Sequence, residues 1–159
     1  AGGVLGYDDK VIPAFKAAVE RGVHVDIAHG RSSFSFRICE AALDQGMPVH
    51  SISSDLHRGN IDVCVLSLAR TLSKFRLLGL SLEDIVRATT LTPASAVGLD
   101  KIGLGSLAVG GPANISLFRE IDRAVEVEDA DGEKRTTRSW IEPIGCFVNG
   151  DYHKAKETI

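Results

Sequence analysis

The segment from residue 23 to residue 57 reads VHVDIAHGRSSFSFRICEAALDQGMPVHSISSDLH. Residues 23–27 alternate apolar and polar side chains between two glycines, a pattern typical of a β-strand. A helix is predicted to begin at Ser32 or Ser33, because a serine cap precedes apolar residues at helical spacing there. Residues 48–53 predict a second short strand. The segment therefore predicts a strand–helix–strand unit with short connections.

Helical patterns lie on both sides of this unit. They cover residues 11–22, a stretch from Asn60 or Asp62 to about Leu78, and a stretch from Ser81 to about Gly98. Alternating strands and helices with short connections are typical of a parallel sheet, either doubly wound or closed into a (β/α)₈ barrel. Only two strand–helix units fit, which is too few for a closed barrel of about 250 residues.

The composition changes from about Gly103 to glycine, proline and short β-branched runs without helical periodicity. Residues 114–118, 124–128, 134–138 and 145–152 predict strands of an antiparallel sheet. The Asp131-Gly132 turn is a hairpin signal between two of them, and residues 145–152 predict a last strand pair that turns at Asn149-Gly150. We therefore expect an α/β part over residues 1–102 and a small β-domain over residues 103–159.

Composition and charge narrow the class of protein. Hydrophobic residues make up 44% of the chain, charged residues make up 25%, and the net charge is -3. These values are typical of a soluble globular protein and provide no overall attraction to nucleic acid or to a membrane. The cysteines are odd in number and far apart, which indicates buried thiols in a reducing, cytoplasmic compartment. They are Cys39, Cys64 and Cys146.

Polar residues follow both predicted strands, where the loops of parallel α/β folds build active sites. Asp55 comes at the end of the second strand and can be a metal ligand and general base. A helix-capping or loop aspartate explains the same position equally well. His29 and His57 can bind a metal or a substrate, or carry protons, although each alone is more often a loop histidine.

A second candidate lies directly after His29. Free backbone N–H groups at a helix start near Ser32 and Ser33 can bind a carboxylate or phosphate, with Arg31 as an added donor. Simple capping serines are the alternative. His24 and His50 lie near the opposite ends of the two strands, so we expect structural roles for them.

Four stretches of the chain resemble a known family. They are residues 25–30 followed by Ser33-Phe34-Ser35-Phe36, residues 52–57 (ISSDLH), residues 92–99 (TPASAVGL) and residues 105–115 (GSLAVGGPANI). Together they resemble the amidohydrolase superfamily, in its deacetylase or dihydroorotase-like branch, which is sometimes labelled adenine deaminase. The first two are similar to the seventh and eighth barrel strands of that branch.

The resemblance implies a C-terminal portion of such a protein: the last two βα units of a TIM-type (β/α)₈ barrel, followed by strands of a small composite β-domain. It implies that Asp55 binds the metal and shuttles the proton of the attacking hydroxide. His29 would contact the substrate, as would Arg31 and Ser33 by the reasoning above. The implied cofactor is zinc, as one or two ions.

The expected function is hydrolysis of amide, ester or cyclic-amide bonds of a small molecule by zinc-activated hydroxide. The family's HxH motif, bridging lysine and middle-strand histidines have no counterpart in this chain. We therefore expect zinc to bind this chain alone weakly or not at all. The expected partners are the missing N-terminal part of the barrel and further copies in a homo-oligomer. The alternative is a non-catalytic, dihydroorotase-like binding or assembly module.

Overall fold

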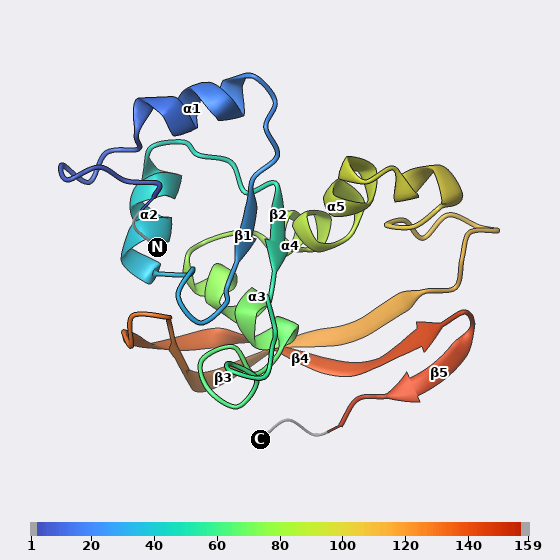
Figure 1. Ribbon diagram of the computed structural model, residues 1–159. Coiled ribbons are helices and arrows are strands. Elements are labelled where there is room, and N and C mark those ends of the chain that lie inside the picture. The colour runs from blue at the N-terminus through green and yellow to red at the C-terminus, as the bar shows by residue number, and fades with distance from the viewer. Residues whose placement is uncertain (1–2, 157–159) are drawn as a thin grey trace.

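The computed structural model describes residues 3–156 of a mixed α/β chain (Figure 1). The elements follow in this order: α1 (Pro13–Glu20), β1 (Asp26–Ala28), α2 (Phe36–Asp44), β2 (Ser51–Ser53), α3 (Leu68–Leu77), α4 (Leu82–Thr89), α5 (Leu91–Ala96), a 3₁₀ helix η1 (Leu99–Ile102), β3 (Ile115–Glu128), β4 (Lys134–Val148) and β5 (Asp151–Lys154). Strands and helices alternate as far as α3, and the strands of the second half follow one another directly.

The predicted strand–helix–strand unit is confirmed by the pairing of β1 with β2. The two strands are parallel, with Asp26 opposite Ser51 and Ile27 opposite Ile52, and α2 connects them. Backbone hydrogen bonds continue past the strand ends, because His29 N donates to the Ser53 carbonyl over 3.1 Å. The carboxyl ends of the two strands therefore stay side by side.

The second half is a three-stranded antiparallel sheet in the order β3–β4–β5. Both hairpins expected from the sequence are present. The second one turns at Asn149 and Gly150, whose positive φ values of 52° and 91° suit an asparagine–glycine turn. The first hairpin is longer than predicted, because β3 and β4 continue to pair across two shifts in their register.

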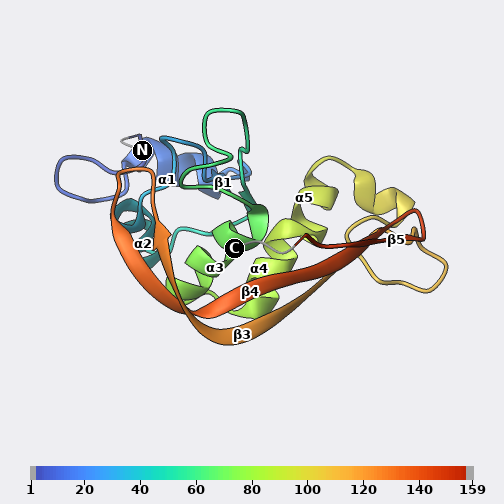
Figure 2. The ribbon, with the colours of Figure 1, turned by 90° about the horizontal axis from the view of Figure 1, so that it is seen from below.

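A single hydrophobic cluster joins the two halves. Helix α3 lies between the small parallel sheet and the curved β3–β4 ribbon (Figures 1 and 2). Phe75 of α3 is fully buried, together with Ile52 of β2 and Ile141 of β4. Both parts of the chain therefore contribute to one core, and a domain boundary at residues 102 and 103 stays a prediction.

The start of α2 differs from the sequence-based prediction. The helix begins at Phe36 rather than after Ser32 or Ser33, and its cap residue, Ser35, makes no side-chain capping bond. Instead, the Phe36 N–H donates to Asp129 Oδ2 over 2.9 Å, from the turn between β3 and β4. This carboxylate lies 93 residues away along the chain, so no local pattern indicated it.

The later helices also differ in their bounds. Helix α3 begins after Ser67, whose hydroxyl accepts from Arg70 N, and not at Asn60 or Asp62. The predicted helix over residues 81–98 is two helices, because the backbone leaves the helical region at Thr90. Its start is confirmed by the Ser81 cap.

Two further sequence-based expectations concern membranes and thiols. Among the residues described, no helix is long and apolar enough to span a membrane. All three cysteines are free; Cys39 and Cys64 are buried, whereas Cys146 is only partly so. Burial raises the pKa of the Cys39 thiol to about 12, so this thiol is an inert part of the core.

Candidate functional site at the carboxyl ends of β1 and β2

Asp55 follows the carboxyl end of β2 and is exposed. Its φ of 46° is unusual for a residue with a side chain and is typical of strained positions at functional sites. Asn60, which is fully buried, donates from Nδ2 to the Asp55 carbonyl over 2.8 Å and accepts from His57 N over 2.8 Å. The buried amide thereby holds the loop in this conformation.

Gly30, at the end of β1, brings two predicted site residues together. A Cβ atom on Gly30 would lie 2.6 Å from Asp55 Oδ2 and 3.2 Å from Ser33 Oγ. The φ of Gly30 is 52°, so both its conformation and its contacts favour glycine. The Asp55 carboxylate therefore packs directly on the Gly30 backbone, with the Ser33 hydroxyl beside it.

Arg31 lies in the neighbouring loop region. Its Nη1 atom is 3.8 Å from the point where a Cβ on Gly59 would stand, and His57 Nδ1 is 3.2 Å from the same point. His57 itself is exposed and accepts a hydrogen bond from Gly59 N over 3.0 Å. The two loops thus place Arg31 and His57 close together, beside the strand ends.

His29 is fully buried, unlike the other three predicted site residues. Its ring stacks on Phe34 at 4.9 Å, and both ring nitrogens are engaged. Nδ1 lies 2.8 Å from the Gly30 carbonyl, and Nε2 lies 2.5 Å from Lys74 Nζ. A substrate contact would require His29 to give up one of these bonds, and its predicted substrate role stays a prediction.

Lys74, on α3, is also fully buried. Besides His29, its ammonium contacts the Cys64 carbonyl at 2.7 Å and the Glu128 carbonyl at 2.6 Å. Burial lowers the pKa of Lys74 to about 8, and burial followed by the Lys74 charge lowers the pKa of His29 to about 4. At neutral pH the pair is therefore an ammonium beside a neutral imidazole.

Polar groups at the opposite, amino ends of the strands bond to one another. Ser51 Oγ donates to Asp26 Oδ1 over 2.6 Å and lies 3.0 Å from His24 Nε2. His50 Nδ1 accepts from Val25 N, and its ring stacks on His24 at 5.2 Å. The structural roles expected for these two histidines agree with this closed arrangement.

The described residues do not make a metal centre by themselves. No group of three or more His, Cys, Asp or Glu side chains among residues 3–156 is arranged to hold an ion. Asp55 offers one carboxylate, which accepts no hydrogen bond from any residue that the structure describes. A metal at Asp55 would need ligands from outside these residues.

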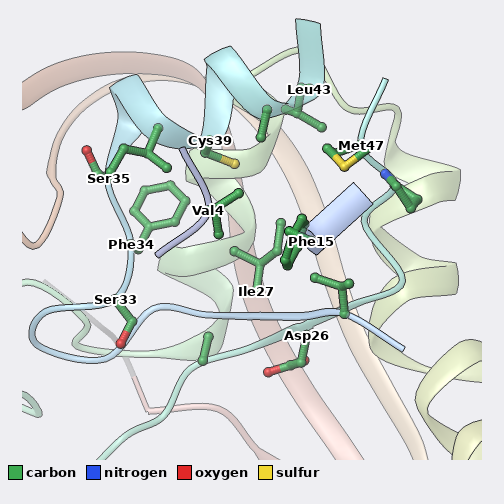
Figure 3. Close-up of a pocket in the computed structure, with 15 residues that line it drawn as sticks. Val4, Phe15, Asp26, Ile27, Ser33, Phe34, Ser35, Cys39, Leu43 and Met47 are labelled. Carbon is green, nitrogen blue, oxygen red and sulfur yellow. The ribbon is translucent and has the colours of Figure 1, made fainter. Parts of the chain in front are cut away.

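The cavities lie away from Asp55. One of about 360 Å³ lies between β1 and α2 and is lined mainly by apolar side chains (Figure 3). Ser33 alone of the predicted site residues lines it, and Ile27 and Asp26 leave β1 on opposite sides. A larger cavity of about 880 Å³ lies between helices α3–α5 and the antiparallel sheet. Neither cavity is centred on the strand-end carboxylate.

Comparison with known proteins gives the family. The chain is 33% identical over 151 residues to a deacetylase of Agrobacterium fabrum, covering 95% of the chain. It is 32% identical over 146 residues to a deacetylase of Enterococcus faecalis. The fold matches the crystal structure of an adenine deaminase with a TM-score of 0.90 and 30% identity over 96% of the chain. The chain belongs to the amidohydrolase superfamily.

A dihydroorotase structure matches this amidohydrolase chain with a TM-score of 0.78 and 30% identity. No family model matches the chain. The chain spans 37% of the Agrobacterium deacetylase and 41% of the adenine deaminase structure. This share is consistent with the expectation that the barrel's N-terminal part is missing from these residues.

Three residues that hold the segments around this candidate site were not predicted from the sequence. They are Asn60, Lys74 and Asp129, which are all buried and all bond to backbone groups. Lys74 and Asp129 reach segments that are distant along the chain, whereas Asn60 bonds within its own loop. A signal existed for one of them: Lys74 precedes Leu77 and Leu78 by three and four positions, which places it on a helix face that packs against the core. A lysine there needs buried acceptors.

Proposed function

We propose that the complete protein is a metal-dependent hydrolase of amide, ester or cyclic-amide bonds in small molecules. The observation that carries this proposal is the Asp55 carboxylate: exposed, held at a positive φ and packed against Gly30 at the paired carboxyl ends of β1 and β2. Parallel α/β folds place their reacting groups at this edge. The relatives named deacetylase support the same class of reaction.

In this proposal Asp55 takes a proton from the attacking water and returns it to the leaving group. Its carboxylate is suited to that role because none of the described residues donates a hydrogen bond to it. Its oxygens can therefore accept the proton of the attacking water. Ser33 and Arg31 are proposed to contact polar groups of the substrate. A bound zinc would lower the pKa of the attacking water to about 7, and its remaining ligands would lie outside this chain.

Replacing Asp55 with Asn in the complete protein tests the proposal. The substrates are a panel chosen from the relatives: acetylated amines and esters, dihydroorotate and adenine. Loss of a positioned proton carrier should lower kcat by about 10³-fold on whichever compound turns over, while circular dichroism and thermal unfolding stay unchanged.

Asp26→Asn is the matched control, since Asp26 is a carboxylate on β1 that receives bonds from two serine hydroxyls. It should keep kcat within about threefold while lowering stability by about 1–3 kcal/mol. Full turnover in Asp55→Asn would refute the proton role. No turnover of any compound by the wild type would favour the non-catalytic binding module.

A further inference from the structure

The buried pair formed by Lys74 and His29 has no place in the proposed chemistry, yet it lies directly behind the site. Lys74 comes from α3, His29 from the end of β1, and the two other acceptors of the ammonium come from the loop at Cys64 and the end of β3. One ammonium therefore ties together four segments of the chain. No carboxylate forms an ion pair with it among the residues described.

The contacts of an ammonium beside a neutral imidazole fix where the protons are. An ammonium has three N–H donors and no lone pair, so His29 Nε2 must accept from Lys74. The remaining proton of the neutral ring then sits on Nδ1, which donates to the Gly30 carbonyl over 2.8 Å. A bond at one ring nitrogen thus selects the tautomer that bonds at the other.

The two peptide groups that flank the Gly30 Cα are both held by hydrogen bonds. The Gly30 N–H donates to the Ser54 carbonyl over 3.2 Å, and the Gly30 carbonyl accepts from His29. The thiol of Cys64 lies 3.7 Å from the same carbonyl. Since the Asp55 carboxylate packs on this glycine, any rotation of the peptide moves the surface beneath Asp55.

We propose that Lys74 is a positioning residue for the strand-end site: it keeps His29 in the Nδ1-protonated form, which holds the Gly30 peptide against which the Asp55 carboxylate rests. The role of Asp55 in turnover belongs to the proposed function, on which this inference rests. Lys74 touches no reacting atom and acts through His29 and Gly30.

The first test leaves both Lys74 and His29 in place in the protein that is measured. Nitrogen-15 NMR of the complete protein at pH 7 distinguishes the two neutral tautomers of an imidazole from the imidazolium, and the His29→Asn spectrum assigns the signals. We expect His29 to be neutral with its proton on Nδ1. An Nε2-protonated ring or an imidazolium would overturn the proposal, whether or not a Lys74 variant folds.

The second test replaces Lys74 with Met, which keeps the side chain as far as the ε position and removes the donors. We expect loss of the fixed Nδ1-protonated state and a fall in kcat of about 10–100-fold, with KM within about threefold. Ser73→Ala is the matched control, because Ser73 is buried on the same helix but bonds to Ile141 N instead. It should lower stability without altering the tautomer or kcat.

The outcomes separate the two proposals. An unchanged kcat in Lys74→Met, beside a large loss in Asp55→Asn, would overturn the positioning role alone. Unchanged turnover in Asp55→Asn would overturn the proposed function, while the tautomer of His29 would still test the contact with Lys74. Equal losses of kcat in Ser73→Ala and Lys74→Met would show that general destabilisation explains both.

Discussion

The two ends of the β1–β2 pair differ in how their polar groups are satisfied. At the amino ends, His24, Ser51 and Asp26 bond to one another, so their hydrogen-bonding capacity is used within the protein. At the carboxyl ends, the Asp55 carboxylate has no such donor within residues 3–156 and sits on a strained backbone against Gly30. Polar side chains at one end stabilise the sheet, and those at the other remain available to a ligand.

Alanine substitutions at two glycines test this difference with the largest expected effect. Gly30→Ala should lower kcat of the complete protein by about 10²-fold, because the new methyl would stand 2.6 Å from Asp55 Oδ2 and displace the carboxylate. Gly22→Ala, before β1, adds a methyl at a φ of 88° with no atom within 4 Å. Steady-state kinetics should show no change in kcat for this variant.

Both substitutions force an alanine to adopt a positive φ, so both should lower the free energy of unfolding by about 1–2 kcal/mol. The backbone penalty is therefore matched, and only the contact with Asp55 differs. If the two variants lose kcat equally, the positive φ of Gly30 explains its effect. The contact between Gly30 and the Asp55 carboxylate would then have no role in turnover.

The pH dependence of stability offers a second test. The pKa of His29 is lowered to about 4 in the folded state, from 6.5 in a free side chain, by burial, with Lys74 adding to the effect and Asp129 opposing it. As pH falls below about 6.5, the unfolded chain gains a proton that the folded chain does not, so folding loses stability. From pH 6.5 to pH 5 this loss should be about 2 kcal/mol.

Urea unfolding at the two pH values checks this expectation. Other carboxylates also titrate in acid, so the informative quantity is the difference between wild type and His29→Asn. The variant should lose about 2 kcal/mol less than the wild type over the same range. An identical acid loss in both proteins would mean that the pKa of His29 is not lowered in the folded state.

The smallest effect is expected at the amino ends. Ser51→Ala removes a donor to Asp26 and a partner of His24, and should lower the free energy of unfolding by about 1 kcal/mol. Because these groups do not face the substrate in the proposed site, kcat should remain within about twofold. A large loss of turnover without a loss of stability would show that both ends of the strands take part in the chemistry.

Much of the fold follows from local patterns. Period-two alternation located β1, and the Asp131-Gly132 and Asn149-Gly150 pairs located both hairpins of the second half. The helix starts were less predictable, because a cap can come from a distant residue. No local pattern indicated that the Asp129 carboxylate receives the Phe36, Asp131 and Glu133 N–H groups.

The sequence by itself determined the order of strands and helices and the position of Asp55 at a strand end, because these depend on neighbours within a few residues. Only the tertiary structure decided that His29 is buried and that it contacts Lys74, since these residues are 45 positions apart and meet through packing of α3 on the sheet. Periodicity indicates which face of an element is buried. It does not indicate which buried groups will find one another.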